Sequence, residues 1–383
     1  MRIRLALIGQ GLVASHFEAG IARLKEGDME PYGVPLAKFQ LPYRPEDIDI
    51  VSSYDVDNAK VGKSAYDVAM QLMGNEFPVP SSLKDIEIRR GIHLGSSRGM
   101  PFSAGGLEDS EGVRGAISRL ADEWRSLDVD VVVNIITTES GRAFDSADGL
   151  RRTIEAGGPG LTASHAYAYA LAEYASRRGG AAFVNSIPTP LANDKGVVDL
   201  YAERSAVVLG DDGATGATPL TADLLEHMAE RNRKIGFIVQ FNIGGNTDFL
   251  ALTDPGRNAM KELTKSGAVS DILGYDAPHY IKPTGYLEPL GDRKFVAMHL
   301  SYLSFNNALD DVYVLARIND SPALAGILVD LVRLAKIAVD RGMRGTIYPV
   351  NAFYMKRPGP SDSRATSKIL AFEGLKKWLG LIG

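Results

Sequence analysis

The sequence predicts a doubly wound α/β sheet that is interrupted by a second, β-rich domain. Strand-like apolar runs alternate with amphipathic helical runs up to about residue 210, and a glycine turn follows the first strand. Four more strand-like runs then follow with little helix between them. The 383 residues are too many for one small core, so we expect two domains, one of them interrupted.

The first half alternates regularly. Residues 2–8 read as an apolar strand, and residues 128–138 form a β-branched run typical of a strand buried on both faces of a parallel sheet. Residues 76–112 are rich in Ser, Gly and Pro and are predicted to be an irregular loop. Further strands are predicted at 47–57, 181–190 and 203–210, and helices at 16–27, 64–73, 113–127 and 158–180.

The second half predicts a mainly antiparallel sheet. Its strand-like runs are 234–245, 279–290, 294–305 and 310–320, with one short helix around 259–266. A long apolar helix follows at 321–342, and residues 346–356 are expected to return the chain to the first domain. We therefore expect a first domain over 1–235, an inserted domain over 236–318, and a segment over 319–383 that completes the first domain.

Composition excludes several classes of function. The formal net charge is -5 and no basic tract is present, so nothing indicates a nucleic-acid partner. No apolar run reaches the roughly 18 residues of a membrane span, and the apolar N-terminus reads as a strand rather than a secretory signal, so we expect a cytoplasmic protein. Without cysteine there is no disulfide, thiol nucleophile or thiolate metal site. The six histidines show no zinc-binding spacing; His165 is expected to be packed and His227 solvated.

The glycine turn at 9–15 resembles a dinucleotide-binding turn. Gly9 permits a tight turn after the strand, Gly11 lets a pyrophosphate approach the backbone, and the small Ala14 permits close packing of the helix on the sheet. Asp55 is the matching acid for a ribose diol and favours NAD over NADP, although it lies well beyond the usual ~20-residue spacing, so a loop must be inserted. The alternative is an ordinary strand–turn–helix connection without a ligand. The expected cofactor contacts here are Gly9, Gly11, Leu12, Val13 and Asp55.

The loop GDDGATGAT at 210–218 is a candidate anion site. Thr215, Gly216, Ala217 and Thr218 offer backbone donors and two hydroxyls at a predicted helix start, which suits a phosphate monoester. A plain helix cap with a flexible lead-in would read the same way. The acids before it repel phosphate, so they are expected to face a nicotinamide ribose, a metal or a lysine cluster. Possible oxygen ligands for Mg²⁺ or Mn²⁺ are Asp211, Asp212 and Asp248.

Four lysines could have a chemical use if they converge. Lys261 and Lys265 are spaced to share one helix face, Lys294 opens a strand, and Lys356 follows an apolar run. Converging lysines bind phosphate, stabilise an enolate oxygen and lower one another's pKa, so that one becomes a base. Each lysine alone reads as an ordinary surface residue, and spacing does not show convergence.

Six segments resemble, in order, successive blocks of the myo-inositol-1-phosphate synthases, with the shorter prokaryotic branch the closer match. The resemblance is dense over 185–358; before that, the glycine turn, the DVD at 55–57 and the NIITTES segment fit the family's cofactor domain. The segments are GDDGATGATPLTADLLEHMAERN, FNIGGNTDFLAL, KELTKSGAVSDIL, LGDRKFVAMHL, NDSPALAGILVDLVRLAKIAVDRG and NAFYMKRP.

The resemblance implies a Rossmann domain built from both ends of the chain, an inserted catalytic and tetramerisation domain, and tightly held NAD. It also implies glucose 6-phosphate as substrate. In the family, C5 is oxidised, the C6 enolate attacks the C1 aldehyde, and the same NADH reduces the ring ketone. A divalent or monovalent cation could assist. Negative charge develops on oxygen atoms during these reaction steps, and fixed lysine cations in the active site would stabilise it.

By matching motif, the resemblance assigns roles to particular residues. The implied catalytic set is Lys261, Lys265, Lys294, Lys356, Asp212, Asn246, Asp248 and Asp320. The loop Thr215–Thr218 matches the phosphate grip, and Thr137, Thr138 and Asp211 join the expected cofactor contacts. In the lysine-pair block, Met260 and Thr264 stand where the family has serines. Ala214 stands where the family usually has a loop lysine, which weakens the expected phosphate grip.

Three functions remain open from the sequence. The resemblance favours the synthase. An NAD-dependent dehydrogenase of another small substrate would share both domains but would not need four lysines and a phosphate loop. A synthase-related paralogue with a different sugar phosphate, or with no catalysis, is the third.

Overall fold

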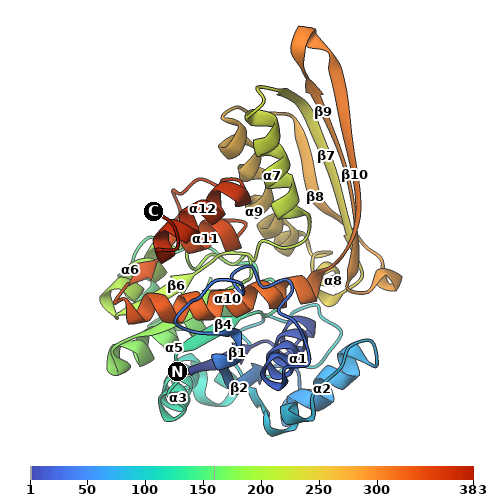
Figure 1. The fold of residues 1–383 in the computed structure, drawn as a ribbon. Coiled ribbons are helices and arrows are strands. Elements are labelled where there is room, and N and C mark those ends of the chain that lie inside the picture. The colour runs from blue at the N-terminus through green and yellow to red at the C-terminus, as the bar shows by residue number, and fades with distance from the viewer. Residues whose placement is uncertain (1, 159) are drawn as a thin grey trace.

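In the computed structural model the predicted fold class is confirmed: a parallel sheet with helices on both faces carries a second, smaller mixed sheet (Figure 1). The structure describes residues 2–158 and 160–383, and in one helix only the backbone of residues 260 and 262–267. None of the helices described is both long and apolar enough to cross a bilayer.

The large sheet has the strand order β3-β2-β1-β4-β5-β6-β11, all parallel. Its strands are β1 (Ile3–Ile8), β2 (Ile48–Asp55), β3 (Ile88–Arg90), β4 (Val131–Asn134), β5 (Ala181–Asn185), β6 (Ala206–Leu209) and β11 (Gly345–Thr346). Strand order reverses between β1 and β4, and ligands of such sheets bind at the carboxyl ends of the strands at this reversal.

Two apolar layers cover this sheet because alternate side chains of its strands point to opposite faces. On one face, β1 contributes Ala6 and Ile8 to a core with α3 (Glu108–Ser126), α4 (Ala147–Ala156), α5 (Ala163–Arg178) and α6 (Lys195–Glu203). On the other, Leu5 and Leu7 pack with α1 (Leu12–Glu26), α10 (Asp320–Asp340), α11 (Tyr348–Tyr354) and α12 (Lys368–Leu379). Helix α2 (Ala65–Met73) packs beside α1.

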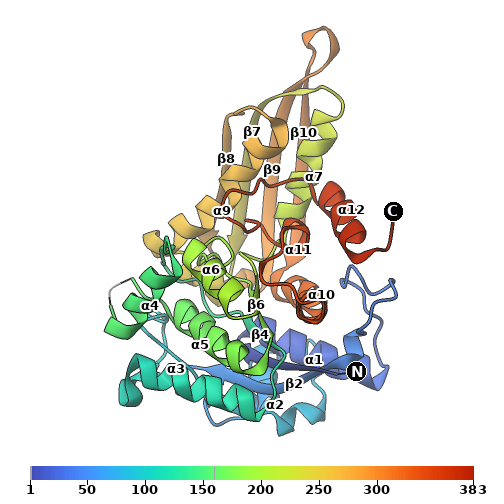
Figure 2. The ribbon, with the colours of Figure 1, turned by 90° about the vertical axis from the view of Figure 1, so that its left-hand side faces the viewer.

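The small sheet has the order β10-β9-β7-β8 and stands away from the large one (Figure 2). Its strands are β7 (Lys234–Gly244), β8 (His279–Tyr286), β9 (Arg293–Leu303) and β10 (Leu309–Asn319). Pairs β10–β9 and β9–β7 are antiparallel, as predicted for most of the sheet. Strands β7 and β8 pair in parallel, because the helices α8 (Thr247–Ala251) and α9 (Pro255–Leu273) carry the chain back between them.

One face of the small sheet is covered and the other is open. Leu225 and Met228 of α7 (Ala217–Ala229) pack with Val269 of α9 on Ile238 and Leu300 of the sheet. Helix α7 precedes residue 235, so the structure places this part of the predicted first domain with the second sheet. On the opposite face, large side chains are exposed: Phe237, Phe241, Tyr280, Tyr313 and Leu315.

Several element predictions need correction. The predicted loop at 76–112 contains β3 and the start of α3, and the short helix predicted at 259–266 is the 19-residue α9. The helix predicted from 158 begins at Ala163, and residue 159 lies outside the described residues. Helices α4 and α6 were not predicted.

The inserted loop required between α1 and β2 is fastened to α10 by a buried ion pair. Arg333 Nη1 lies 2.6 Å from Asp330 Oδ1, and Arg333 Nε donates to the carbonyl of Tyr43 at 2.8 Å. Asp330 Oδ2 accepts from the Leu36 amide at 2.7 Å and from the Tyr354 hydroxyl at 2.8 Å. One charged pair thus joins the loop, α10 and α11.

Replacing Arg333 with Met should lower the free energy of unfolding by about 3–5 kcal/mol, because it leaves the Asp330 carboxylate buried and unpaired. Chemical denaturation followed by circular dichroism measures this. The double variant Arg333→Met/Asp330→Asn should recover part of the loss, since no buried charge then lacks a partner. Equal losses in the single and double variants would contradict this account of the pair.

Candidate active site

A cavity of about 390 Å³ lies at the carboxyl ends of β1, β2 and β4 and extends to the small sheet. Most of the residues expected at the site line it: Gly9, Gly11, Leu12, Val13, Asp55, Thr137, Thr138, Asp212, Thr215, Ala217, Thr218, Asn246, Asp248, Lys261, Lys294, Asp320 and Lys356. Residues from both halves of the chain therefore share one cavity.

The glycine turn forms the end of the cavity next to β1. Gly9 has φ of 102°, and a Cβ there would lie 2.9 Å from the backbone of Ile135, so the turn packs directly on the segment after β4. Gly11 is different: a Cβ built on it meets no atom within 4 Å. Gly11 is also the N-cap of α1, and the first amides of a helix have no intrahelical acceptor. Space and free donors thus coincide where a pyrophosphate would bind.

Asp55 lies beside this turn. Its Oδ2 accepts from the Gln10 amide at 2.8 Å, and its Oδ1 accepts from the amides of Val56 and Asp57. Lys60, which the sequence analysis did not single out, also lines the cavity and lies 3.3 Å from Asp55. The carboxylate is fixed at the end of β2, where a dinucleotide's adenosine ribose would be held.

The segment after β4, which carries Thr137 and Thr138, is hydrogen-bonded to the start of α5. Glu139 is buried and accepts from the amides of Ala163 and Ser164 at the start of α5, both at 3.0 Å, and from the Ser164 hydroxyl at 2.6 Å. Burial raises the pKa of Glu139, although these hydrogen bonds oppose the shift. Thr138 in turn donates to Asp248 Oδ1 at 3.1 Å, which links this segment to the small sheet's side of the cavity.

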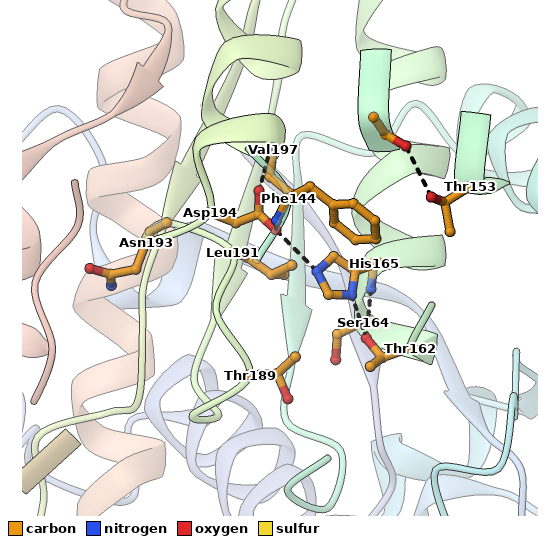
Figure 3. A network of polar contacts seen from close by, with 12 residues as sticks. Phe144, Thr153, Thr162, Ser164, His165, Thr189, Leu191, Asn193, Asp194 and Val197 are labelled. Atoms are coloured by element: carbon orange, nitrogen blue, oxygen red, sulfur yellow. Dashed lines mark hydrogen bonds and ion pairs between the residues drawn. The ribbon is translucent and has the colours of Figure 1, made fainter. Parts of the chain in front are cut away.

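A buried histidine network supports the same segment (Figure 3). His165 is fully buried, with Nδ1 2.7 Å from the Thr162 hydroxyl and Nε2 3.2 Å from Asp194 Oδ2. Asp194 Oδ2 also accepts from the Phe144 amide at 2.9 Å. His165 is thus a packed residue, as predicted, and His227 is exposed.

The two adjacent acids have opposite roles. Asp211 is fully buried, and the structure does not bring it to the cavity as the sequence analysis expected. Its carboxylate accepts five hydrogen bonds of 2.7–3.1 Å from Asn185 Nδ2, the amides of Leu191, Ala192 and Asn193, and Asn193 Nδ2. Burial raises the pKa of Asp211 and these donors oppose the rise. Asp211 therefore builds the loop after β5, and Asp212 faces the lysines.

Three of the four expected lysines converge. Lys356 Nζ lies 2.8 Å from Asp212 Oδ1, and Lys261 Nζ lies 3.4 Å from the same oxygen. Lys261 is also 3.3 Å from Asp248, and Lys294 is 2.5 Å from Asp320. Lys265 is in α9, but its side chain lies outside the described part of the chain.

The environment separates the pKa values of two of these lysines. Burial lowers the pKa of Lys356; Asp212 opposes this shift, and the positive charges of Lys261 and Lys294 add to it. For Lys261, burial is outweighed by Asp212, Asp248 and Asp320, so its pKa is raised. Burial would raise the pKa of Asp320, but the neighbouring lysines lower it. The cavity thus holds a lysine with a lowered pKa beside a lysine with a raised pKa.

The start of α7 faces the same cluster. Gly216, with φ of 65°, is the N-cap of α7, and Lys294 packs directly against its α-carbon. Thr215 donates to Asp320 Oδ1 at 3.3 Å, while Ala217 and Thr218 line the cavity. Free helix amides and an ammonium group therefore lie together, which is an arrangement suited to a phosphate.

Asn246 and Asp292 hold the ends of two elements. Asn246 Oδ1 accepts from the Phe249 amide at the start of α8, and Asn246 Nδ2 donates to Asp292 Oδ1 at 2.9 Å. Asp292, which the sequence analysis did not single out, also accepts from the Ser321 amide at 2.8 Å. These bonds fix the start of α10 and hence Asp320.

In the described part of the chain no three His, Cys, Asp or Glu side chains are grouped so that they could hold a metal ion. The three acids suggested for Mg²⁺ or Mn²⁺ are engaged by protein donors: Asp211 by the loop after β5, Asp212 by two lysines and Asp248 by Lys261. A cation here would need further oxygen ligands from a bound molecule.

Sequence comparisons agree with this geometry. The family model for myo-inositol-1-phosphate synthase matches residues 216–321. The inositol-3-phosphate synthase of Corynebacterium glutamicum is 29% identical over 385 residues, covering 97% of this chain and 98% of that protein. The inositol-3-phosphate synthase of Mycolicibacterium smegmatis is 28% identical, with 93% of each chain covered.

Comparisons with solved structures give the same family. The inositol-3-phosphate synthase of Caenorhabditis elegans shares the fold, with a TM-score of 0.83 at 17% identity over 99% of this chain and 85% of that one. A myo-inositol-1-phosphate synthase-related protein from Thermotoga maritima is 56% identical, covers 99% of both chains and superposes with a TM-score of 0.94. The chain belongs to the myo-inositol-1-phosphate synthase family.

Proposed function

We propose that the protein is an NAD-dependent isomerase that converts D-glucose 6-phosphate to 1L-myo-inositol 1-phosphate. The observation that carries this proposal is the single cavity that joins a dinucleotide turn to a cluster of lysines and a helix N-terminus. A simple dehydrogenase needs the dinucleotide turn but has no evident use for the lysine cluster. Family membership supports the same reaction.

The residues present fit NAD. The open space at Gly11, the free amides of α1 and the fixed carboxylate of Asp55 would hold the pyrophosphate and the adenosine ribose. Thr137, Thr138 and Asp212 would lie toward the nicotinamide. Bound NAD would supply reversible hydride acceptance at C5, which makes the overall reaction redox-neutral.

The substrate phosphate is assigned to the start of α7. Backbone amides of this turn, the hydroxyls of Thr215 and Thr218, and the Lys294 ammonium would hold it. Because Ala214 supplies no loop charge, the phosphate depends more heavily on Lys294 than it would with a lysine at 214. In this proposal, Lys294 of β9 supplies the positive charge that a lysine in the loop supplies elsewhere in the family.

Acid–base work is assigned to the lysines around Asp212. Lys356, with its lowered pKa, is the group best able to remove a proton, and the C6 proton beside a C5 ketone is the one that must leave. Lys261 stays protonated, so its ammonium can stabilise the enolate oxygen that develops. Asp212 Oδ1 lies between both amines and fixes their positions.

Replacing Lys294 with Ala should sharply lower product formation and raise the KM for glucose 6-phosphate, since the cation beside Gly216 is lost. Phosphorus NMR after incubation with glucose 6-phosphate and NAD measures the product, and absorbance at 340 nm measures NADH. The parent protein and the surface control Lys195→Ala should both form inositol 1-phosphate without net NADH. Accumulating NADH would indicate a dehydrogenase, and unchanged substrate with and without Mg²⁺ would indicate a different sugar phosphate or no catalysis.

Replacing Lys356 with Ala should lower kcat about 10²–10⁴-fold, the usual contribution of a general base. Added methylamine should restore part of the rate in proportion to its unprotonated form, so rescue should grow as pH rises. In the parent, a lysine base with a lowered pKa predicts a rate that rises with pH, with the midpoint of the rise below pH 10.5. Lys356→Arg keeps the charge and should not be rescued; equal rescue of both variants would exclude Lys356 as the base.

We further propose a homotetramer that uses the open face of the small sheet. This face exposes Phe241, Tyr313 and Leu315, at 43%, 69% and 76% of their full accessibility. Exposed apolar side chains grouped on one face indicate an interaction surface, whereas apolar residues exposed singly do not. Leu315→Asp should shift the protein to smaller species in size-exclusion chromatography with light scattering. The matched variant Ile369→Asp, at an exposed position of α12, should not; a monomeric parent protein would refute the proposal.

A further inference from the structure

A buried arginine joins the nucleotide side of the cavity to the helix that carries Lys261. Arg257 lies in the first turn of α9 and is only 7% exposed. Its Nη2 donates to the carbonyl of Ser96 at 2.9 Å and to the carbonyl of Arg98 at 3.0 Å. Its Nη1 lies 3.5 Å from Met100 Sδ. One guanidinium therefore holds a whole turn of a segment far away in the sequence.

That segment, residues 93–106, belongs to the nucleotide half of the cavity. Ser96, Ser97, Met100 and Phe102 line the cavity there. The chain just before this segment and the segment's own far end are tied to the end of β2, since Gly91 donates to the Asp55 carbonyl and Gly105 donates to the Val56 carbonyl. A dinucleotide held at Asp55 would thus contact the same turn that Arg257 holds.

The other end of the link is the catalytic cluster. Lys261 is four residues after Arg257 in α9, so the two side chains share one side of the helix one turn apart. Lys261 contacts Asp212 and Asp248, and Asp248 accepts from Thr138 of the segment after β4. The start of α9 also approaches the segment after β4, since a Cβ built on Gly256 would lie 3.6 Å from Ser140 Oγ. The start of α9 therefore rests on two segments that line the nucleotide half.

We propose that Arg257 is a positioning residue that couples occupancy of the nucleotide half to the placement of Lys261. This role rests on the proposed function. A dinucleotide that packs on Ser96 and Met100 fixes their turn, the two carbonyls fix the guanidinium, and the guanidinium fixes the start of α9. Since coupling between two sites is reciprocal, the nucleotide and the sugar phosphate each bind more tightly in the presence of the other.

The test measures binding of glucose 6-phosphate by calorimetry, with and without saturating NADH. NADH is the probe because its reduced nicotinamide cannot accept the C5 hydride, so the ternary complex does not react. For the parent protein stripped of nucleotide we expect NADH to tighten glucose 6-phosphate binding about tenfold, within the range usual for coupled sites. Hydrogen exchange of the α9 amides should slow in parallel.

In Arg257→Met, the ratio of the glucose 6-phosphate affinities with and without NADH should fall from about ten to close to one. The affinity for NADH itself should stay within about threefold of the parent value, because Arg257 does not contact the nucleotide's own binding groups at Gly11 and Asp55. NADH should no longer slow exchange in α9. Arg257→Lys should restore part of the ratio, since an ammonium group can donate to one of the two carbonyls. A purely structural role would change thermal stability without changing the ratio.

Arg90→Met is the matched control. Arg90 Nη1 donates to the carbonyl of Gly105, so its loss loosens the same segment without touching α9. The ratio should survive in this variant. An unchanged ratio in Arg257→Met, or an equal loss in Arg90→Met, would overturn the role of Arg257 and leave the proposed function standing. If NADH does not bind the parent protein, the proposed function and this role of Arg257 are both wrong.

Discussion

The carboxylate of Asp212 is the interaction on which the rest of the site depends. Two amino groups, those of Lys356 and Lys261, lie within 3.4 Å of one of its oxygens, in a cavity where Asp212 itself is only 1% exposed. Without that negative charge, like charges this close in a dry environment would drive one lysine out or neutralise it. With it, the two amines stay together and their pKa values still shift in opposite directions, because Asp248 and Asp320 favour the charge on Lys261. One carboxylate thereby permits both the base and the fixed cation that the proposed function requires.

Asp212 can hold this position because its neighbour is used entirely for structure. Asp211 takes five hydrogen bonds from Asn185 and from residues 191–193, which fixes the backbone immediately before Asp212. The backbone on its other side is fixed too, since Lys356 donates its amide to the Asp212 carbonyl and Ala214 donates to Tyr354. The C-terminal part of the chain thus supplies both Lys356 and the strand-like pairing that aligns the carboxylate with it.

Sequence reasoning reached features that depend on local spacing. Gly9, Gly11 and Asp55 follow from what a turn and a strand end require, and the structure places them around one space. Helix α4 could also have been found, since Ser146 caps its start and Gly157 ends it in the left-handed conformation. The opposite roles of Asp211 and Asp212 could not have been predicted from the sequence. Consecutive residues in an irregular loop have no periodicity that shows which way each side chain points. Convergence of Lys261, Lys294 and Lys356 depends on the packing of two sheets, so only family resemblance suggested it.

The position of Lys294 shows why the proposed phosphate site keeps a positive charge although Ala214 stands where the family usually has a lysine. Its ammonium group lies against the α-carbon of Gly216, where any side chain at residue 216 would displace it, and Asp320 holds it from the other side. A lysine at 214 would add charge from a loop, whereas Lys294 comes from a β-strand paired on both edges. The ammonium is therefore held in place before a ligand arrives, and less side-chain entropy is lost on binding. The same rigidity makes the proposed phosphate position depend on how the small sheet is set against the large one, and Thr138, Asn246 and Asp292 are the contacts that fix that setting.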